Sequence, residues 1–430
     1  MLETLRSRRL VRHLPRRHLP AVPALATILA ATVLAGCSSK ALPLATSPTS
    51  SSATTAATAP TTTTSGPKPF VLSDVRHVFV IVLENESYSS TFGSPSDDPY
   101  LGSSLVKEGA LLTNFYAIGH DSADNYIAMI SGQPPTIDTQ DDCGDYVNIS
   151  GSLGPGGIET GDGCVYPPDG PTIASQLTSA GFTWKAYMQD MGNIPSRESA
   201  ACGHPAINSS DGTEVAVPGD GYATRHDPFM YFHSIIDNEQ YCDSHVVALG
   251  TTKGQMPSAA LPGETGLAAD LRSVSTTPNY SFITPNLCED GHDFPCINQP
   301  SGQSAYADYD SFLQAWVPLI TASPAFKQNG MLIVTFDEAE TGPDADAACC
   351  GERPGPTAPE PGKNGPGGGI IGAVVLSPFV RPGTVSRVDY NDFSLLATVE
   401  NMFGLSKLGE AATTTSMFGR DVFDSSGLRS

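Results

Sequence analysis

The run Val78-Phe79-Val80-Ile81-Val82-Leu83, followed directly by Glu84-Asn85, indicates the centre of the fold. Consecutive apolar residues rich in valine and isoleucine are typical of a strand that is buried on both faces. A second run of this kind, Met331-Leu332-Ile333-Val334-Thr335-Phe336, ends at Asp337-Glu338. In parallel sheets, ligands bind beyond the carboxyl ends of the strands. Two buried strands that end in carboxylates therefore predict a site at that edge of one sheet.

Further strand-like runs alternate with helix-like ones along the chain. The expected strands are 78–83, 182–188, 280–284, 331–336 and 370–376. The expected helices are 103–108, 125–131, 172–180, 308–320 and 393–402. This alternation predicts an α/β fold with a mostly parallel sheet flanked by helices. Three stretches rich in Gly, Pro and Asp, 143–170, 193–277 and 341–369, are expected to be insertions that wall the site.

The oxygen atoms at the two strand ends suit a hard divalent cation, which prefers several oxygen ligands. Glu84, Asn85, Asp337 and Glu338 are the candidate metal ligands. The hydroxyl of Ser122, in the stretch Gly119 to Tyr126, is a further candidate ligand. Coordination would activate this hydroxyl as a nucleophile. Oxygen-rich ligands favour Mg, Ca or Mn, whereas a histidine ligand leaves Zn or iron open.

Ser122 also stands at the expected start of a helix, where backbone N–H groups and the helix dipole favour a bound phosphate. Asn125, one turn later, could donate to a phosphate oxygen. His120 and His292 could contact the phosphate or protonate the leaving alkoxide, and Asp290 belongs to the same candidate phosphate site. Together these residues predict phosphoryl transfer through a phosphoserine, followed by attack of water.

Each of these features also has a purely structural interpretation. Ser122 could be only the cap of the following helix, which is the more common role of such a serine. A lone Glu84-Asn85 is usually a turn. Asp290 and His292 stand between two cysteines and could belong to a tight cystine loop. The functional interpretation rests on the presence of all these elements together.

The nine cysteines indicate disulfides. Apart from Cys37 they form an even set of eight, which in an exported chain favours disulfide bonds. Proximity in the sequence favours the pairs Cys143–Cys164, Cys202–Cys242 and Cys288–Cys296, which leaves Cys349 and Cys350 as a vicinal pair. A zinc cluster is the alternative, but the sequence contains no C-x-x-C motif.

The first 36 residues have the character of a signal peptide, with an arginine-rich start and an apolar stretch of about 13 residues. Leu34-Ala35-Gly36-Cys37 resembles a bacterial lipobox, which predicts a lipid anchor on Cys37 at the outer face of the cell membrane. An ordinary signal peptide is the alternative. Residues 37–68, rich in Ser, Thr, Pro and Ala, are expected to be a disordered tether, and 69–430 the catalytic domain.

The net charge of −22 bears on the partners of this chain. A strongly acidic surface repels polyanions, so nucleic acid is not an expected partner. The apolar stretch near the start is shorter than the roughly 18 residues that a membrane-spanning helix needs. Membrane attachment is therefore expected through the lipid anchor and not through a spanning helix.

Five motifs in a fixed order resemble those of the bacterial phosphoesterase family that holds secreted acid phosphatases and phospholipases C. They are 80–85, 119–132, 283–293, 334–338 and 380–396. The resemblance implies an alkaline-phosphatase-like fold. It also implies that Ser122 is the nucleophile, that Glu84, Asn85, Asp337 and Glu338 hold metal, and that His120, Asn125 and His292 contact phosphate.

Two positions depart from the family pattern, because Asp121 and Asp124 stand where the family often has proline. An additional carboxylate beside Ser122 would repel phosphate unless it points away. Sulfatases, which share the wider fold, need a different pattern, and Asp124 and Tyr126 argue against sulfate esters. The leading hypothesis is a phosphomonoesterase acting on a phosphate ester, with phosphoinositides and phospholipids as candidates. A phospholipase C and a non-catalytic surface binding protein are the alternatives.

Overall fold

The strand β1 (His77–Leu83) lies inside an eight-stranded sheet, and all seven of its residues are buried. The computed structural model describes residues 71–423 except 95, 97, 252–265, 298–303, 364 and 415. The expected signal peptide and tether lie outside the described residues. Among the described residues, no helix is both long and apolar enough to cross a membrane.

The strands of the large sheet follow the order β11-β2-β10-β9-β1-β8-β5-β7. Their bounds are β2 Ala110–Leu112, β5 Trp184–Met188, β7 Val246–Ala248, β8 Tyr280–Thr284, β9 Gly330–Phe336, β10 Ala373–Leu376 and β11 Thr384–Ser386. β1 pairs in parallel with both β8 and β9, and β5 pairs in parallel with β8 and β7. Only β10 runs antiparallel to both of its neighbours in this sheet. The expected mostly parallel sheet is therefore confirmed.

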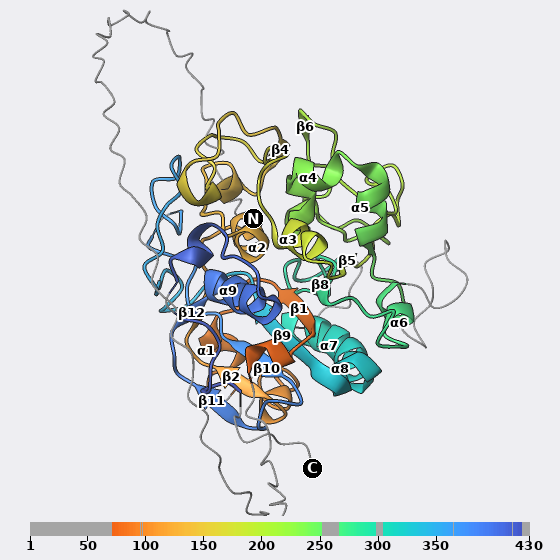
Figure 1. Ribbon diagram of the computed structural model, residues 1–430, viewed down its shortest axis with the longest axis vertical. Helices are drawn as coiled ribbons and strands as arrows, with labels where there is room; N and C mark the ends of the chain where they lie inside the picture. Colours follow the sequence, from red (N-terminus) through yellow and green to blue (C-terminus); the bar gives the residue numbers. More distant parts are fainter. Residues whose placement is uncertain are drawn as a thin grey trace, which may run out of the picture. The chain divides into compact units, whose positions relative to one another are not determined.

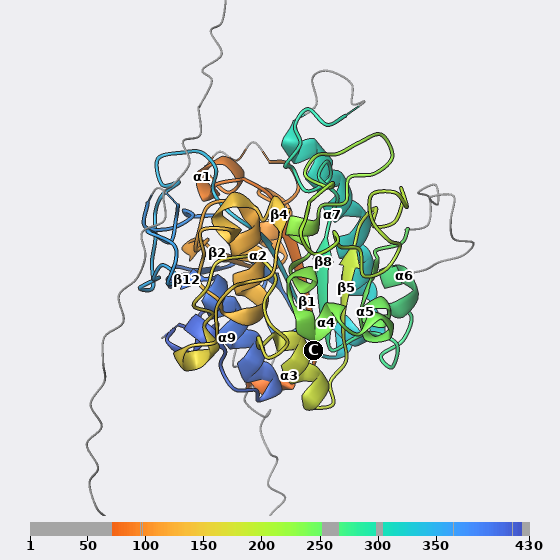
Figure 2. The same ribbon diagram turned by 90° about the horizontal axis from the view of Figure 1, so that it is seen from above.

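Helices cover both faces of the sheet (Figure 1). The helices are α1 Tyr88–Thr91, α2 Ser122–Ser131, α3 Ile173–Ser179, α4 His233–Ile236, α5 Glu239–His245, α6 Gly266–Asp270, α7 Ala305–Ala322, α8 Pro324–Asn329 and α9 Asp392–Phe403. α2, α3 and α9 pack together on one face (Figure 2), and α7 and α8, which contact each other and β9, lie on the other (Figure 1). Two short sheets, β3 (Phe115–Tyr116) with β12 (Tyr390–Asn391) and β4 (Asp145–Tyr146) with β6 (Ser209–Ser210), complete the fold.

The ends of the two helices nearest the site follow from local chemistry. α9 begins after Asn391, whose side chain accepts from the backbone N–H of Ser394 in a capping box. α2 ends at Gly132 and α9 at Gly404, both with a positive φ of about 70°, a conformation that glycine adopts without strain. These signals fix both ends of α9 and the end of α2.

The expected elements differ from the observed ones mainly at the sheet edges. All five expected strands lie in the sheet, although the last of them, β10, is antiparallel. The expected helix 103–108 is only a 3-10 turn, Leu105–Lys107. The stretch 193–277 is more than an insertion, because it contributes β7 to the sheet. β2, β7 and β11 have three residues each, too few for a recognisable alternation.

Four disulfides hold the loops, and they join the pairs expected from proximity. They are Cys143–Cys164, Cys202–Cys242, Cys288–Cys296 and the vicinal pair Cys349–Cys350. Cys143–Cys164 and Cys288–Cys296 lie in stretches with little regular structure, and Cys202–Cys242 ties such a stretch to α5, directly before β7. Such bonds stabilise a fold mainly by restricting the unfolded chain.

Candidate active site

Glu84 and Asp337 meet at the carboxyl end of the sheet because β1 and β9 pair in register. Leu83 lies opposite Phe336, so the next residue of each strand lies at the same edge. The N–H of Asn85 donates to Asp337 Oδ1 at 3.0 Å, and both carboxylates are fully buried. Asn85 has a positive φ of 66°, which turns the chain away from the strand.

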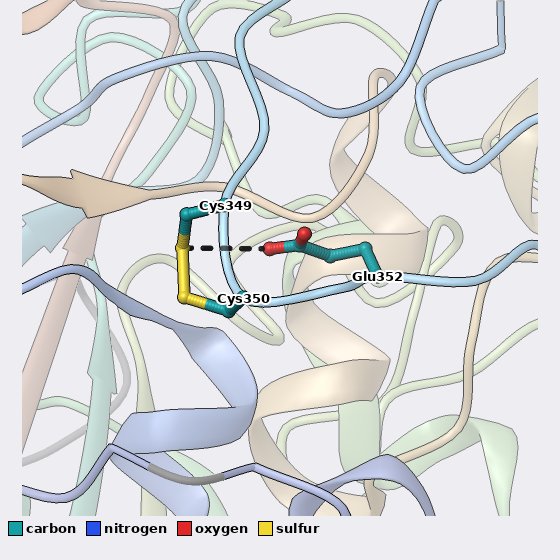
Figure 3. A group of neighbouring side chains, drawn as sticks. All are labelled: Cys349, Cys350 and Glu352. Carbon is teal, nitrogen blue, oxygen red and sulfur yellow. Dashed lines mark hydrogen bonds between the residues drawn. A yellow bond between two sulfur atoms is a disulfide. The ribbon is translucent and has the colours of Figure 1, made fainter.

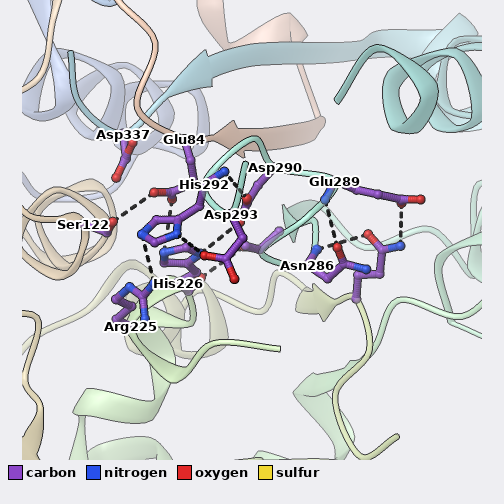
Figure 4. A network of polar contacts seen from close by, with 12 residues as sticks. Glu84, Ser122, Arg225, His226, Asn286, Glu289, Asp290, His292, Asp293 and Asp337 are labelled. Carbon is purple, nitrogen blue, oxygen red and sulfur yellow. Dashed lines mark hydrogen bonds and ion pairs between the residues drawn. The ribbon is translucent and has the colours of Figure 1, made fainter. Parts of the chain in front are cut away.

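Ser122 faces Glu84 from the first turn of α2 (Figure 4). Its Oγ donates to Glu84 Oε2 at 2.9 Å, and Tyr126, one turn later, donates to Glu84 Oε1 at 2.6 Å. One helix therefore fixes both oxygens of this carboxylate. The residue before Ser122, Asp121, has a φ of 72°, so the chain enters the helix through a sharp turn. Unusual backbone conformations of this kind are concentrated at functional sites.

His226 completes the arrangement, although no motif in the sequence pointed to it. It comes from the stretch 193–277 and is buried. Its Nε2 lies 3.4 Å from Glu84 Oε1, and its Nδ1 lies 3.1 Å from Asp290 Oδ2. The ring stacks on Tyr126 with centroids 5.1 Å apart and planes nearly parallel. The only signal in the sequence is the polar run 224–227 beside the apolar run 229–232, which is weak on its own.

The buried donors fit a divalent cation. Ligand atoms of Glu84, His226 and Asp290 all lie within 4.8 Å of one another. Asp337 Oδ2 is buried without a hydrogen-bond partner, and so is His226 Nε2. With the ring proton on Nδ1 and donated to Asp290, this Nε2 has a free lone pair. Orphaned buried ligand atoms of this kind are costly unless a ligand completes them.

The electrostatics of these donors favour the same interpretation. Burial, and then the charges of Asp337 and Asp290, raise the pKa of Glu84 well above its ordinary value. Burial raises the pKa of Asp290 to about 8. Burial and the nearby Arg225 lower the pKa of His226, which keeps the imidazole neutral and able to bind a metal. A bound cation would offset the mutual repulsion of the carboxylates.

His120 and Glu338 form a pair beside this cluster. His120 Nδ1 contacts Glu338, and its Nε2 donates to the carbonyl of Ala345 at 3.0 Å. The N–H of Glu338 donates to Asp337 Oδ1 at 2.7 Å, so the pair is joined to the candidate metal site. Burial raises the pKa of Glu338 to about 7. The structure thus places Glu338 next to His120. The role of Glu338 as a metal ligand stays a prediction.

The Asn125 side chain holds the loop before Ser122. Its amide donates to the carbonyls of Gly119 and Asp121, at 2.9 and 3.2 Å. Its oxygen accepts from the backbone N–H groups of Ile118 and Gly119, both at 3.0 Å. These four bonds use the full hydrogen-bonding capacity of the Asn125 amide group. The Asn125 side chain is also fully buried. Its predicted contact with phosphate is untested, whereas its role in shaping the Ser122 turn is visible.

His292 and Arg225 lie together on the other side of His226. Arg225 is 2% exposed and donates to His292 Nε2 at 3.0 Å and to the carbonyl of Glu214 at 3.0 Å. His292 Nδ1 in turn donates to Asp293 Oδ1 at 2.9 Å. Asp290, expected among the phosphate-binding residues, faces His226 and Glu84 and fits the metal donors better. Arg225 was not anticipated, and it brings a buried positive charge to the site.

Asp124 turns away from Ser122 and packs under Gly119. It is 1% exposed and neither oxygen has a hydrogen-bond partner. A Cβ at Gly119 would lie 2.4 Å from Asp124 Oδ2, so only glycine leaves room for this carboxyl group. Burial, and then Glu338 and Asp121, raise the pKa of Asp124 well above its ordinary value. A neutral acid that points away explains how a carboxyl residue can follow the nucleophile candidate.

The described residues of 341–369, which we call the wall segment, enclose the His120–Ser122 turn. The carbonyl of Ala345 holds His120, and Lys363 forms an ion pair with Asp121 at 2.5 Å. Gly368 packs so closely that a Cβ there would lie 1.8 Å from the carbonyl oxygen of Gly119. The third expected insertion is therefore confirmed as a wall of the site.

The structure thus combines a mostly parallel sheet with a serine at a helix start and acidic residues at two strand ends. The profile of the family described as Phosphoesterase family matches residues 94–406. The chain belongs to this family, and it is a hydrolase acting on phosphoric ester bonds.

Two relatives of this chain are named as phosphatases. The chain is 25% identical to the phosphatidylinositol-3-phosphatase of Mycobacterium tuberculosis over 335 residues, 78% of this chain and 79% of that protein. It is 25% identical to a probable acid phosphatase of Kluyveromyces lactis over 344 residues, 79% of this chain and 62% of that protein. Its structural neighbours include an alkaline phosphatase superfamily protein from Vibrio parahaemolyticus, with 14% identity, a TM-score of 0.44, and coverage of 83% and 72% of the two chains.

Replacing Gly368 by alanine should push the wall segment away from Gly119. We expect Gly368→Ala to lower the free energy of unfolding by roughly 1–3 kcal/mol, the usual cost of forcing atoms into a packed site. Gly212→Ala is the matched control, because a Cβ there meets nothing within 4 Å. Its effect should stay within about 0.5 kcal/mol. Urea unfolding measures both, and equal effects would contradict the close approach.

Proposed function

We propose that this protein is an exported, metal-dependent phosphomonoesterase of the acid phosphatase type that works through a phosphoserine on Ser122. The observation that carries the proposal is the hydrogen bond from Ser122 to Glu84, which joins a helix-start hydroxyl to a cluster of metal-capable side chains. A phosphate ester is the substrate class, and a phosphoinositide is a candidate because one relative is a phosphatidylinositol-3-phosphatase.

In the first step, Ser122 Oγ attacks phosphorus, and the bond from phosphorus to the leaving alkoxide breaks. The hydroxyl, which donates to Glu84 in the structure, loses its proton to solvent as its oxygen forms the new bond. The N–H groups at the start of α2 and the buried guanidinium of Arg225 are proposed to stabilise the negative charge of the phosphoryl group. His120, which precedes the turn, and His292, which packs against His226, are proposed to donate to the phosphate oxygens or the departing alkoxide.

In the second step, a water molecule attacks the phosphoserine and releases phosphate, and Ser122 recovers its proton. Glu84, His226, Asp290 and Asp337 would hold the cation, with Asn85, Ser122 and Glu338 as the further candidates from the sequence. When bound, a divalent cation supplies positive charge that stabilises the developing negative charge and favours the ionised hydroxyl. Mg, Ca, Mn and Zn all remain candidates, because the donors combine carboxylates with one imidazole.

Ser122→Ala should abolish hydrolysis of p-nitrophenyl phosphate, since it removes the attacking oxygen. Loss of the nucleophile in enzymes of this kind lowers turnover by several orders of magnitude, roughly 10⁴-fold or more. Ser131→Ala, on the same helix but bonded only to its own helix and the following turn, should keep most of the turnover. The p-nitrophenyl phosphorylcholine diester, measured in parallel, tests the phospholipase C alternative. Retained monoester turnover in Ser122→Ala would rule out the mechanism.

Removing the metal should abolish turnover, and adding a divalent cation should restore it. His226→Ala should weaken binding of Mn²⁺ by roughly tenfold or more in calorimetry, because it deletes a donor at the centre of the cluster. His245→Ala is the control, since His245 packs on Trp184 and not on the cluster. Unchanged affinity in His226→Ala, with full turnover after chelation, would refute metal dependence.

The expected anchor at Cys37 completes the proposal, because it would hold the enzyme at the outer face of the cell membrane. Cys37→Ala should release the protein from the membrane fraction into the soluble exported fraction. Fractionation of cells expressing the full chain measures the distribution, with Cys288→Ala as a control for loss of a cysteine elsewhere. An unchanged membrane fraction in Cys37→Ala would refute the lipid anchor.

A further inference from the structure

The vicinal disulfide Cys349–Cys350 lies in the wall segment beside Glu352 (Figure 3). The described residues of this segment form no helix or strand, and turns and single backbone hydrogen bonds to neighbouring segments hold it in place. Cys350 has a positive φ of 65°, a conformation that is unfavourable for a residue with a Cβ. The disulfide between these neighbouring cysteines therefore holds the backbone in a turn that it would not favour without the bond.

This pair is the most accessible of the four disulfides. Cys350 is exposed and Cys349 is half-buried, whereas the other six cysteines are buried or half-buried. Attack by a reductant requires access to a sulfur atom, so Cys350 is the open point of entry. The other bonds close loops of 8 to 40 residues, whereas this one joins neighbours and restricts the unfolded chain least. Its reduction therefore leaves the fold intact.

Two short paths connect the pair to the active site. Four residues before Cys349, the carbonyl of Ala345 accepts the hydrogen bond from His120 Nε2. In the other direction, Cys349 Sγ lies 3.6 Å from the carbonyl of Tyr390 and 3.8 Å from Glu352 Oε1. Glu352 accepts from Asn391, the residue that caps α9. The disulfide thus stands between the support of His120 and the start of a helix that packs on α2.

We propose that Cys349–Cys350 is a redox modification site that controls the order of the wall segment and, through His120, the rate of the enzyme. The activity readout of this inference rests on the proposed function. A dithiol reductant supplies two electrons and two protons, the S–S bond breaks, and both cysteines become thiols while the reductant closes its own disulfide. The turn at 349–350 then relaxes, and the Ala345 carbonyl no longer holds the His120 ring in one orientation.

The test is a titration of the full chain with dithiothreitol, read in three ways. Alkylation and mass spectrometry identify the cysteines that are reduced, hydrogen exchange follows the wall segment, and p-nitrophenyl phosphate hydrolysis gives the rate. We expect Cys349 and Cys350 to be alkylated first and exchange in the wall segment to rise. Turnover should fall roughly tenfold, equivalent to about 1.4 kcal/mol, and recover on re-oxidation.

The variant Cys349→Ser/Cys350→Ser serves as a permanently open form. It should show the low rate from the start and no further response to mild reductant, which excludes effects of the other three bonds. Should this variant fail to fold, the wild-type titration decides alone. Earlier reduction of another pair, or unchanged exchange and turnover after reduction of this one, overturns the inference. Rising exchange in a chain that hydrolyses no ester supports the redox site and contradicts the proposed function.

Discussion

The in-register pairing of β1 with β9 is the constraint on which the site depends. It places Glu84 and Asp337 side by side at the end of a fully buried sheet, and β8 brings Asp290 to the same edge. Burial raises the pKa of all three carboxyl groups, and the charges of Asp337 and Asp290 raise the pKa of Glu84 further. Such a cluster is stable only if protons, hydrogen bonds or a cation offset the charge. The residues around the cluster offset this charge.

The neighbouring elements supply these compensating groups from separate parts of the chain. α2 contributes Ser122 and Tyr126, which hold both oxygens of Glu84. The stretch 193–277 contributes His226 with one free ring nitrogen, and Arg225 with a buried positive charge. The wall segment closes over the turn before α2. The candidate nucleophile, a buried positive charge and the candidate metal donors therefore lie together at the edge of the sheet where the buried carboxyl groups need compensating groups.

The sequence predicted the parts of this arrangement whose signal is local and strong. Two apolar runs that end in carboxylates identify β1, β9 and their acidic ends, and proximity alone identifies the cysteine pairs. It could not predict β2, β7 and β11, which are too short to show a period. It also missed Arg225 and His226, because a side chain delivered from an irregular stretch leaves no pattern. The positions of Asn125 and Asp124 depend on the turn at Gly119, whose geometry only the three-dimensional structure reveals.

The most direct test of the account is whether phosphate becomes attached to Ser122 during turnover. The enzyme, loaded with a divalent cation, is mixed with p-nitrophenyl phosphate, quenched in acid within milliseconds to seconds, and digested for mass spectrometry. The account predicts one added phosphoryl group on the peptide that contains Ser122, and none in Ser122→Ala. Active enzyme with no phosphorylated peptide at any quench time, or with phosphate on another residue, would contradict it.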